Sequence, residues 1–547
     1  MAIRPGALPV HGLAAMLLLC ATRAGGMEPV ELRAKDTLTP VEMDVGDVLQ
    51  FRLRGGRVFT LALEDTHAAI VERVEPGGIV YRFTARVLVD GEQMVMERYA
   101  CSQECFYEPY VINGVRIWLD IVRDVFDLIP IRYPRTGNRQ CFPRKAARLA
   151  LQDATLRVCP QETRSWIETE REFLDVGDCY NGDDCYLGPY LGQACHVGMD
   201  LNHARGSPLF APIDFDTQAY FNSLAMGHNN NRWRGIRRWE NGDIWALQTH
   251  HLIDLLVPEN TPLAAGTKYA TTAGVHVGSH EHTHFEFKIA RPRDPPSAGR
   301  RSDAAAPLSI AVPIDFDDES ELAQAQPEVL HLDPWIMFWQ IFEDRNARRG
   351  ELHAAISPLS PARTGDPVRF AAEGSRPGPG GGDVRCYWAF GDGGAARGMT
   401  ASHVFARRGV YPVTLVVDNG VRRAAITHHL TVAGEPVAEP VLALAAPDEP
   451  SFLPRPVSAL DVYGRPVRLL PHRLYFVARA SRLMPRPKTL RLQNLGRGDL
   501  GPVATRIEYE EGTGWLKAAA KDEQAAELAV DATGLAPGTY RATVEVT

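Results

Sequence analysis

Histidines gather in three short stretches of the chain, and the last of them reads HTHFEF over residues 282–287. Side chains alternate between the two faces of a strand, so an extended conformation would place His282, His284 and Glu286 on one face. Two imidazoles that point the same way can hold a metal ion, and neutral imidazole is the commonest protein ligand for zinc. Because the HxH pattern also occurs on polar strand faces without a metal, this stretch predicts a site only if other ligands join it.

The other two stretches supply candidates for those ligands. In ACHVGMDLNHARGSP, His196 and Asp200 lie four residues apart. On an extended segment they share a face, and Gly198 between them leaves room for a close approach. In ALQTHHLIDLLV, His251 ends an apolar run that is typical of a strand. A lone histidine there is usually structural, but beside two candidate ligand pairs it becomes a candidate for proton transfer.

The combined set favours a catalytic zinc site over a structural one. A catalytic zinc uses three protein ligands and keeps one position for water, whose pKa it lowers toward neutrality. Histidines that do not bind the metal can carry protons, since their pKa lies close to ambient pH. A structural site would give the extra histidines no role, so the pattern predicts metal-assisted hydrolysis.

The order of these motifs resembles the lysostaphin-type (LytM-like) zinc metalloendopeptidases over about residues 186–345. Members of that family carry H-x-G-x-D, a Gly-[Ser/Thr]-Pro turn, a His-Leu strand end and HxHFE, and this chain shows HVGMD, GSP, HHL and HTHFEF in that order. The segment LDPWIMF also resembles the family's closing aspartate-proline segment. The resemblance implies a compact, mostly antiparallel β domain with a narrow groove, and substrates among the peptides of bacterial peptidoglycan.

The resemblance also implies roles for individual residues. The zinc ligands would be His196, Asp200 and His284. The catalytic histidines would be His251 and His282, which would help to deprotonate the bound water and stabilise the developing oxyanion.

Neighbouring residues leave alternatives open. Glu286 could orient a ligand histidine, or it could pair with a lysine or arginine. His250 stands where the family usually has a small residue, so the catalytic assignment could move by one position. Cys195 precedes the first ligand and could compete for zinc, although a disulfide is the expected state. The remaining histidines of the segment receive no role: His203, His276 and His280.

The whole chain is predicted to be mainly β and multidomain, because 547 residues exceed one core and the 40 prolines and 47 glycines favour turns. WAFGDGG and SHVFARRGVYPVTLVV resemble a PKD-type β-sandwich, which in exported bacterial enzymes is generally a spacer or a surface-binding unit. The predicted segments are a signal peptide (1–25), an N-terminal β domain (26–125), a Cys-rich connector or pro-like segment (126–185), the zinc metallopeptidase domain (186–345), the PKD-like sandwich (351–433), a linker (434–450) and a C-terminal Ig-like β domain (451–547).

Charge and cysteine content indicate the compartment. The net charge of −8 gives no footprint for nucleic acid. The N-terminus combines Arg4 with a short apolar run and small residues near Ala24, which is typical of a signal peptide and too short to span a membrane. Seven of the nine cysteines lie between Cys101 and Cys195, a cluster that predicts disulfides in an exported chain, with one thiol free or paired with Cys386. A zinc–cysteine site is the alternative.

These observations predict an exported zinc metalloendopeptidase of the periplasm, cell surface or medium. Its substrate would be peptide bonds in peptidoglycan cross-links or stem peptides, or another cell-wall or protein substrate. The first alternative is a catalytically inactive peptidase-like domain that serves as a cell-wall-binding or scaffold protein. The second is latency, in which residues 27–185 cover the groove as a pro-region.

Overall fold

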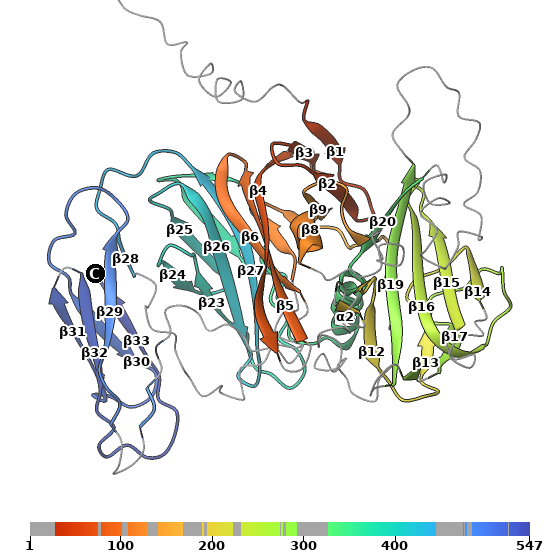
Figure 1. The fold of residues 1–547 in the computed structure, drawn as a ribbon. Helices are drawn as coiled ribbons and strands as arrows, with labels where there is room; N and C mark the ends of the chain where they lie inside the picture. Colours follow the sequence, from red (N-terminus) through yellow and green to blue (C-terminus); the bar gives the residue numbers. More distant parts are fainter. Residues whose placement is uncertain are drawn as a thin grey trace, which may run out of the picture.

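The computed structural model describes most of the chain, in the ranges 28–74, 78–100, 108–128, 141–167, 187, 189–190, 194–221, 231–273, 275–276, 281–292, 327–444, 474, 476–478, 484–522 and 524–547. Several β-sheets follow one another along the molecule (Figure 1), which confirms the predicted fold class, mainly β and multidomain. The predicted signal peptide lies outside the described residues. Within the described ranges, no helix is long and apolar enough to cross a membrane.

The N-terminal part begins with a five-stranded sheet. In spatial order its strands are β1 (Val30–Arg33), β3 (Val48–Arg52), β4 (Val58–Val74), β5 (Gly78–Val89) and β6 (Glu92–Ala100). The sequence VFTLALE alternates in β4, so that Phe59, Leu61 and Leu63 are buried and the residues between them are partly exposed. This period of two directs one face of the sheet toward the core.

A second sheet joins the N-terminal part to the PKD-like sandwich. Its nine strands are β2 (Thr39–Met43), β9 (Ala147–Asp153), β8 (Val115–Val122), β7 (Tyr110–Ile112), β27 (Arg423–Ala433), β26 (Gly409–Asp418), β23 (Arg385–Ala389) and β24 (Ala395–Arg397) in spatial order, with β21 (Ala362–Arg363) beside β27. The joint is the parallel pair β7–β27. The other layer of the sandwich holds β22 (Pro367–Ala371) and β25 (Thr400–Val404). The PKD-like unit is therefore built onto the N-terminal part through a shared sheet.

The candidate site residues lie on a third sheet, at the right of Figure 1, in which every described pair is antiparallel. Its main path is β12 (Met199–Asn202), β19 (Glu281–Pro292), β16 (Ile244–Leu255), β15 (Asn231–Arg238) and β14 (Thr217–Phe221). Further strands extend it: β13 (Pro208–Phe210), β17 (Lys268–Thr272), β18 (Val275–His276) and β20 (Pro327–Leu332). A short hairpin, β10 (Pro189–Tyr190) and β11 (Ala194–Cys195), precedes β12.

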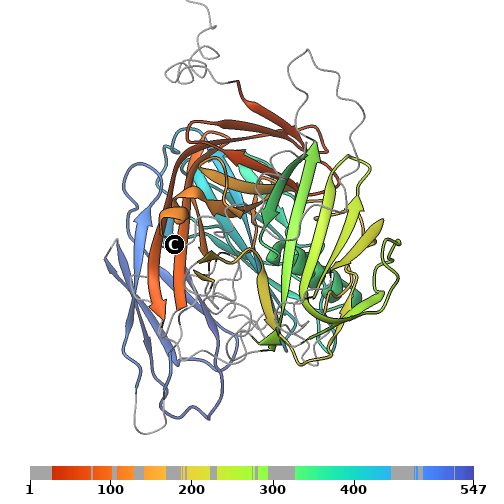
Figure 2. The same ribbon diagram turned by 45° about the vertical axis from the view of Figure 1, so that its right-hand side comes forward.

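Helix α2 (Trp335–Arg349) lies between this sheet and the N-terminal strands (Figures 1 and 2). It follows Pro334 and ends at Gly350, whose φ of +62° provides the left-handed cap that glycine adopts most easily. Phe338 contacts Phe285 of β19, with ring centroids 5.3 Å apart. Trp339 contacts Trp118 of β8 at 5.4 Å. One continuous hydrophobic core therefore runs from the N-terminal strands through α2 to the site sheet.

A buried charge cluster ties the start of α2 to the N-terminal part. Arg98 of β6 forms an ion pair with Asp333, and Arg148 Nε donates to Asp120 Oδ2 at 2.7 Å. The Asp333 amide donates to Asp120 Oδ1 at 3.1 Å, and Asp333 Oδ1 accepts from the Trp335 amide at 2.9 Å. Buried charges are tolerated only when they are paired in this way, so the N-terminal part holds the start of α2 in place.

The described part of the predicted connector belongs to the same core. Trp166 is fully buried between Phe285 and Phe338, with ring centroids 4.8 and 5.5 Å away. Cys159 and Cys386 are buried free thiols, so the predicted pairing of Cys386 with a cluster cysteine is not formed. Cys141 is a third buried free thiol. The remaining clustered cysteines lie outside the described residues or have side chains that are not described.

The C-terminal unit forms two small sheets at the left end of Figure 1. One contains β28 (Leu442–Leu444), β29 (Lys488–Asn494), β32 (Ala525–Val530) and β31 (Leu516–Asp522); the other contains β30 (Thr505–Tyr509) and β33 (Ala542–Val546). Strand β28 falls inside the predicted linker 434–450, so part of that segment is a strand of the C-terminal unit.

In the N-terminal part, a short 3-10 helix, η1 (Arg123–Asp127), follows β8.

Candidate metal centre

Strand pairing brings the three predicted ligands together. Asp200 of β12 stands directly opposite His284 of β19, and His196 lies just before β12. His284 Nδ1 is 2.8 Å from Asp200 Oδ1 and 2.9 Å from His196 Nε2, and His196 Nε2 is 3.3 Å from the same carboxylate oxygen. All three side chains are buried. The alternation expected for HTHFEF is observed, with Phe285 and Phe287 on the opposite, core face of β19.

The separations of these donor atoms fit a tetrahedral zinc ion. Ligand nitrogens and oxygens about 2.0 to 2.1 Å from zinc lie about 3.3 Å apart at tetrahedral angles, close to the observed 2.8 to 3.3 Å. Burial would raise the pKa of Asp200, but the histidines, His196 first, hold it well below its ordinary value. Burial would lower the pKa of His284, yet hydrogen bonds to Asp200 and Glu286 raise it to about 9. The centre thus stabilises positive charge, as a metal site must.

Gly198 is required for this geometry. A Cβ atom at this position would lie 2.5 Å from Cε1 and Nε2 of His284, and closer still to the carbonyl oxygen of Phe285. The HVGMD segment can therefore lie against the His284 ring only because residue 198 has no side chain.

The two predicted catalytic histidines face each other beside the ligands. The ring centroids of His251 and His282 are 4.7 Å apart with the planes at 84°. His282 Nε2 lies 3.5 Å from Asp200 Oδ2. Burial, and then the neighbouring His282, lower the pKa of His251 to about 3, so that imidazole is neutral at physiological pH. Its Nδ1 atom is buried and makes no hydrogen bond within the described residues.

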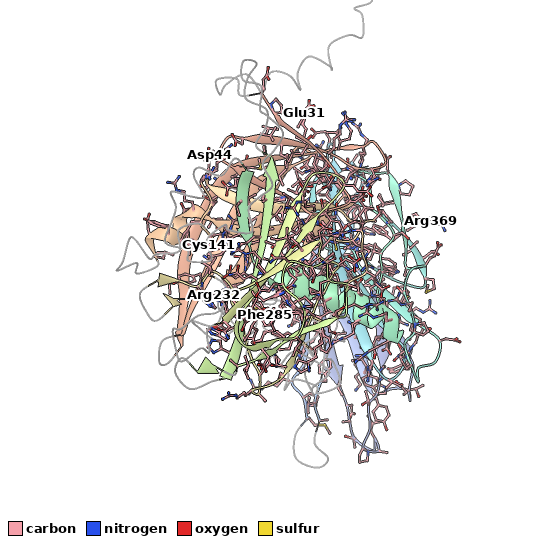
Figure 3. All side chains as sticks on the ribbon, turned by 90° about the vertical axis from the view of Figure 1, so that its right-hand side faces the viewer. Glu31, Asp44, Cys141, Arg232, Phe285 and Arg369 are labelled. Carbon is pink, nitrogen blue, oxygen red and sulfur yellow. The ribbon has the colours of Figure 1, made fainter. Side chains whose placement is uncertain are left out.

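A β-bulge in β16 explains how two consecutive histidines reach one face. Leu252 pairs with Asn231 and His250 pairs with Arg232, so His251 is the extra residue of the strand. Its φ of +65° is in the left-handed region. A bulge interrupts the alternation of side chains and redirects the residues on either side, so both His250 and His251 lie next to β19. Figure 3 labels Arg232 and Phe285, which lie on β15 and β19 of this sheet.

Glu286 lies behind the ligand His284. Its Oε1 atom is 3.2 Å from His284 Nε2 and 3.1 Å from His250 Nε2, and its Oε2 atom is 2.5 Å from Lys288 Nζ. Burial would raise the pKa of Glu286, but Lys288 and the two histidines hold it well below its ordinary value. Both alternatives for Glu286 are therefore present together: it contacts the candidate ligand and it pairs with a lysine.

Some residues near the site were missed or given no role from the sequence. Gln248 and Lys288 were not identified, although continuing the alternation of β19 by two residues would have found Lys288. His203 belongs to neither of the two groups of described side chains that could hold a metal. His276 of β18 pairs with Glu281 of β19, and the side chain of His276 is not described. His280 lies outside the described residues.

Comparison with known proteins gives one family match and several structural neighbours. The PKD domain family matches residues 353–433, close to the predicted 351–433. No curated protein matches the chain.

Several of the structural neighbours are peptidases. The catalytic domain of lysostaphin from Staphylococcus simulans is 19% identical, with 18% of this chain and 68% of that chain covered and a TM-score of 0.15. A putative peptidase M23 from Pseudomonas aeruginosa is 11% identical, with coverages of 54% and 93% and a TM-score of 0.19. A zinc-containing peptidase from Vibrio cholerae is 12% identical, with coverages of 45% and 81% and a TM-score of 0.17. At these values, the function of this chain has to be inferred from its own residues.

Proposed function

We propose that this chain is an exported zinc metalloendopeptidase that hydrolyses peptide bonds in peptidoglycan cross-links or stem peptides. The observation that supports it best is the convergence of His196 Nε2, Asp200 Oδ1 and His284 Nδ1 beside two further histidines. Three mixed ligands with neighbouring proton carriers are the arrangement that a hydrolytic zinc requires. The peptidoglycan substrate rests on the motif resemblance.

His196, Asp200 and His284 would hold the zinc ion. A bound zinc supplies an acidified water and a polarised scissile carbonyl. His251 and His282 would carry protons and contact the substrate. The neutral His251 ring has a buried Nδ1 atom that makes no hydrogen bond among the described groups, which leaves this atom available to donate to a developing oxyanion. The contact of His282 with Asp200 orients the second imidazole toward the ligands.

One observation favours a second candidate function, a catalytically inactive peptidase-like domain that acts as a cell-wall-binding or scaffold protein. The site side chains are almost inaccessible: His196 is 4% exposed and His251, the most exposed of the five, is 9% exposed. A peptide substrate reaches such a site only after a rearrangement, whereas a structural zinc needs no access.

Metal analysis combined with digestion of purified peptidoglycan tests the proposal. Wild-type protein should contain zinc and release peptide fragments that mass spectrometry identifies. The variants Asp200→Ala and His284→Ala should lose zinc and hydrolysis together, and His203→Ala, a histidine outside the metal group, should keep both. Full hydrolysis by zinc-free protein would overturn the proposal, and zinc binding without hydrolysis would support the scaffold function.

A further inference from the structure

Glu286 is surrounded by polar groups that come from its own strand, β19, and from the neighbouring strand β16. Its Oε1 atom lies 3.2 Å from His284 Nε2, 3.1 Å from His250 Nε2 and 3.2 Å from Gln248 Nε2. Lys288 Nζ holds the other oxygen at 2.5 Å. The Glu286 side chain has no exposed surface. A buried carboxylate needs such partners to remain charged, and here they also determine where Oε1 points.

The orientation of Gln248 is set from the far side. Its Oε1 atom accepts a hydrogen bond from Arg234 Nε at 2.8 Å, and Lys288 Nζ lies 3.4 Å from the same oxygen. Two cationic donors on the amide oxygen leave the amide nitrogen facing His250 and Glu286, at 2.6 and 3.2 Å. The Gln248 amide therefore donates one hydrogen to His250 Nε2 and the other to Glu286 Oε1, and His284 Nε2 faces the same carboxylate oxygen at 3.2 Å.

The position of Oε1 decides which nitrogen of His284 can bind a metal. Nδ1 of His284 faces Asp200 and His196, and Nε2 faces Glu286. A neutral imidazole carries one proton, so Nδ1 offers a lone pair only when that proton is on Nε2. A carboxylate placed against Nε2 accepts that proton's hydrogen bond and selects this tautomer.

We propose that His250 is a positioning residue that, together with Gln248 and Lys288, holds Glu286 against Nε2 of His284 and so selects the metal-binding tautomer of His284. This inference rests on the proposed zinc site and assigns different roles to the two consecutive histidines. The bulge at His251 directs His251 to His282 and leaves His250 against Glu286. His251 takes part in proton transfer, and His250 acts through Glu286 on the metal.

The same cluster could instead hold a second metal ion, because His250, His284 and Glu286 each offer one donor atom and these atoms lie within 4.8 Å of one another. The charges oppose this. Lys288 already pairs with Glu286, and Arg234 is bonded to the adjoining Gln248. A second divalent cation among these positive groups would also have to share His284 with the first. Metal stoichiometry separates the two possibilities.

The test compares single variants at the two histidines. Zinc affinity is measured by competition with a chelator, hydrolysis is measured at saturating zinc, and the visible spectrum is recorded after substitution with Co²⁺. His250→Ala should weaken zinc binding about 10- to 100-fold, as loss of an outer hydrogen-bond partner does elsewhere, shift the Co²⁺ bands, and retain turnover once zinc is saturating. His250→Gln, which keeps an acceptor for the Gln248 amide, should recover part of the affinity. His251→Ala should keep wild-type zinc affinity and lose turnover.

Three outcomes would overturn the positioning role. One is unchanged zinc affinity and an unchanged Co²⁺ spectrum in His250→Ala, and another is loss of turnover in that variant at saturating zinc. The third is two metal ions per wild-type chain, falling to one in His250→Ala. If wild-type protein binds no zinc at all, the proposed function itself fails. His203→Ala serves as the matched histidine control in every measurement.

Discussion

Replacing Gly198 with alanine should disable the metal centre while leaving the rest of the fold intact. The new Cβ atom would lie 2.5 Å from two atoms of the His284 ring, whereas ordinary contacts of a Cβ atom fall at 3.4–4 Å. On its other side is the carbonyl oxygen of Phe285, which β-sheet pairing holds in place. Movement of the ring alone cannot relieve the contact with the Phe285 oxygen, so the 196–200 segment must shift by about 1 Å relative to His284, whereas metal–ligand distances hold to within about 0.2 Å.

The expected loss follows from the cost of overpacking. Inserting a methyl group into a well-packed site costs about 1–3 kcal/mol. If that strain is relieved by displacing the ligands from one another, zinc affinity falls about 5- to 150-fold, since about 1.4 kcal/mol corresponds to a factor of ten. Chelator competition measures this loss, and thermal unfolding without zinc shows whether the fold survives. Gly55→Ala is the matched control, because a Cβ atom there meets nothing within 4 Å. Wild-type zinc affinity in Gly198→Ala would refute the reasoning.

Three further predictions concern the shared core and the joint between the N-terminal part and the PKD-like unit. Burial lowers the pKa of His428 to about 3. Below about pH 6.5 the unfolded chain therefore binds a proton at His428 that the folded chain does not bind, and the free energy of unfolding should fall by about 2 kcal/mol between pH 6.5 and pH 5. Urea unfolding of His428→Gln should show a smaller decrease of stability over the same pH range. The side chain of Asn113 donates to Thr431 Oγ1 at 2.7 Å and accepts from the Thr431 amide at 3.1 Å. Asn113→Ala should lower the free energy of unfolding by about 1–3 kcal/mol and speed proteolytic release of the PKD-like unit. An unchanged digestion pattern would contradict this. Trp166→Ala should destabilise the fold by about 3–5 kcal/mol, measured by denaturant unfolding; a loss below 1 kcal/mol would show that Trp166 does not anchor the core.

The order of the motifs and its resemblance to a known family named the candidate ligands, and strand alternation predicted which of them share a face. The alternation in HTHFEF separates His284 from Phe285, and an extended HVGMD segment carries two donors on one face, so both features depend only on a period of two. The bulge that places His250 beside Glu286 could not be predicted in this way. It depends on a left-handed conformation at His251, which a residue other than glycine adopts only when the surrounding sheet imposes it.

Long-range pairing was the other feature beyond the reach of sequence patterns. The sheet shared by the N-terminal part and the PKD-like unit depends on one parallel pair, β7 with β27, in which Ile112 lies opposite His429. Strand β7 is only three residues long, and periodicity cannot tell which edge such a short strand will join. The predicted boundary at residue 351 therefore separates two segments of sequence that the fold joins again through hydrogen bonds.

The joined core bears on the idea that residues 27–185 act as a removable pro-region. A cover that proteolysis removes should leave the catalytic domain with its own complete core. Here Trp166 packs against Phe285, directly beneath the ligand His284, and Arg98 pairs with Asp333 at the start of α2. Cutting away the N-terminal part would remove the cation that pairs with Asp333 and the ring that covers Phe285, and would expose apolar surface of β19 and α2 to water. Excision of residues 27–185 would remove contacts that hold β19 and α2, so a test of latency has to measure the stability of the truncated chain together with its hydrolysis.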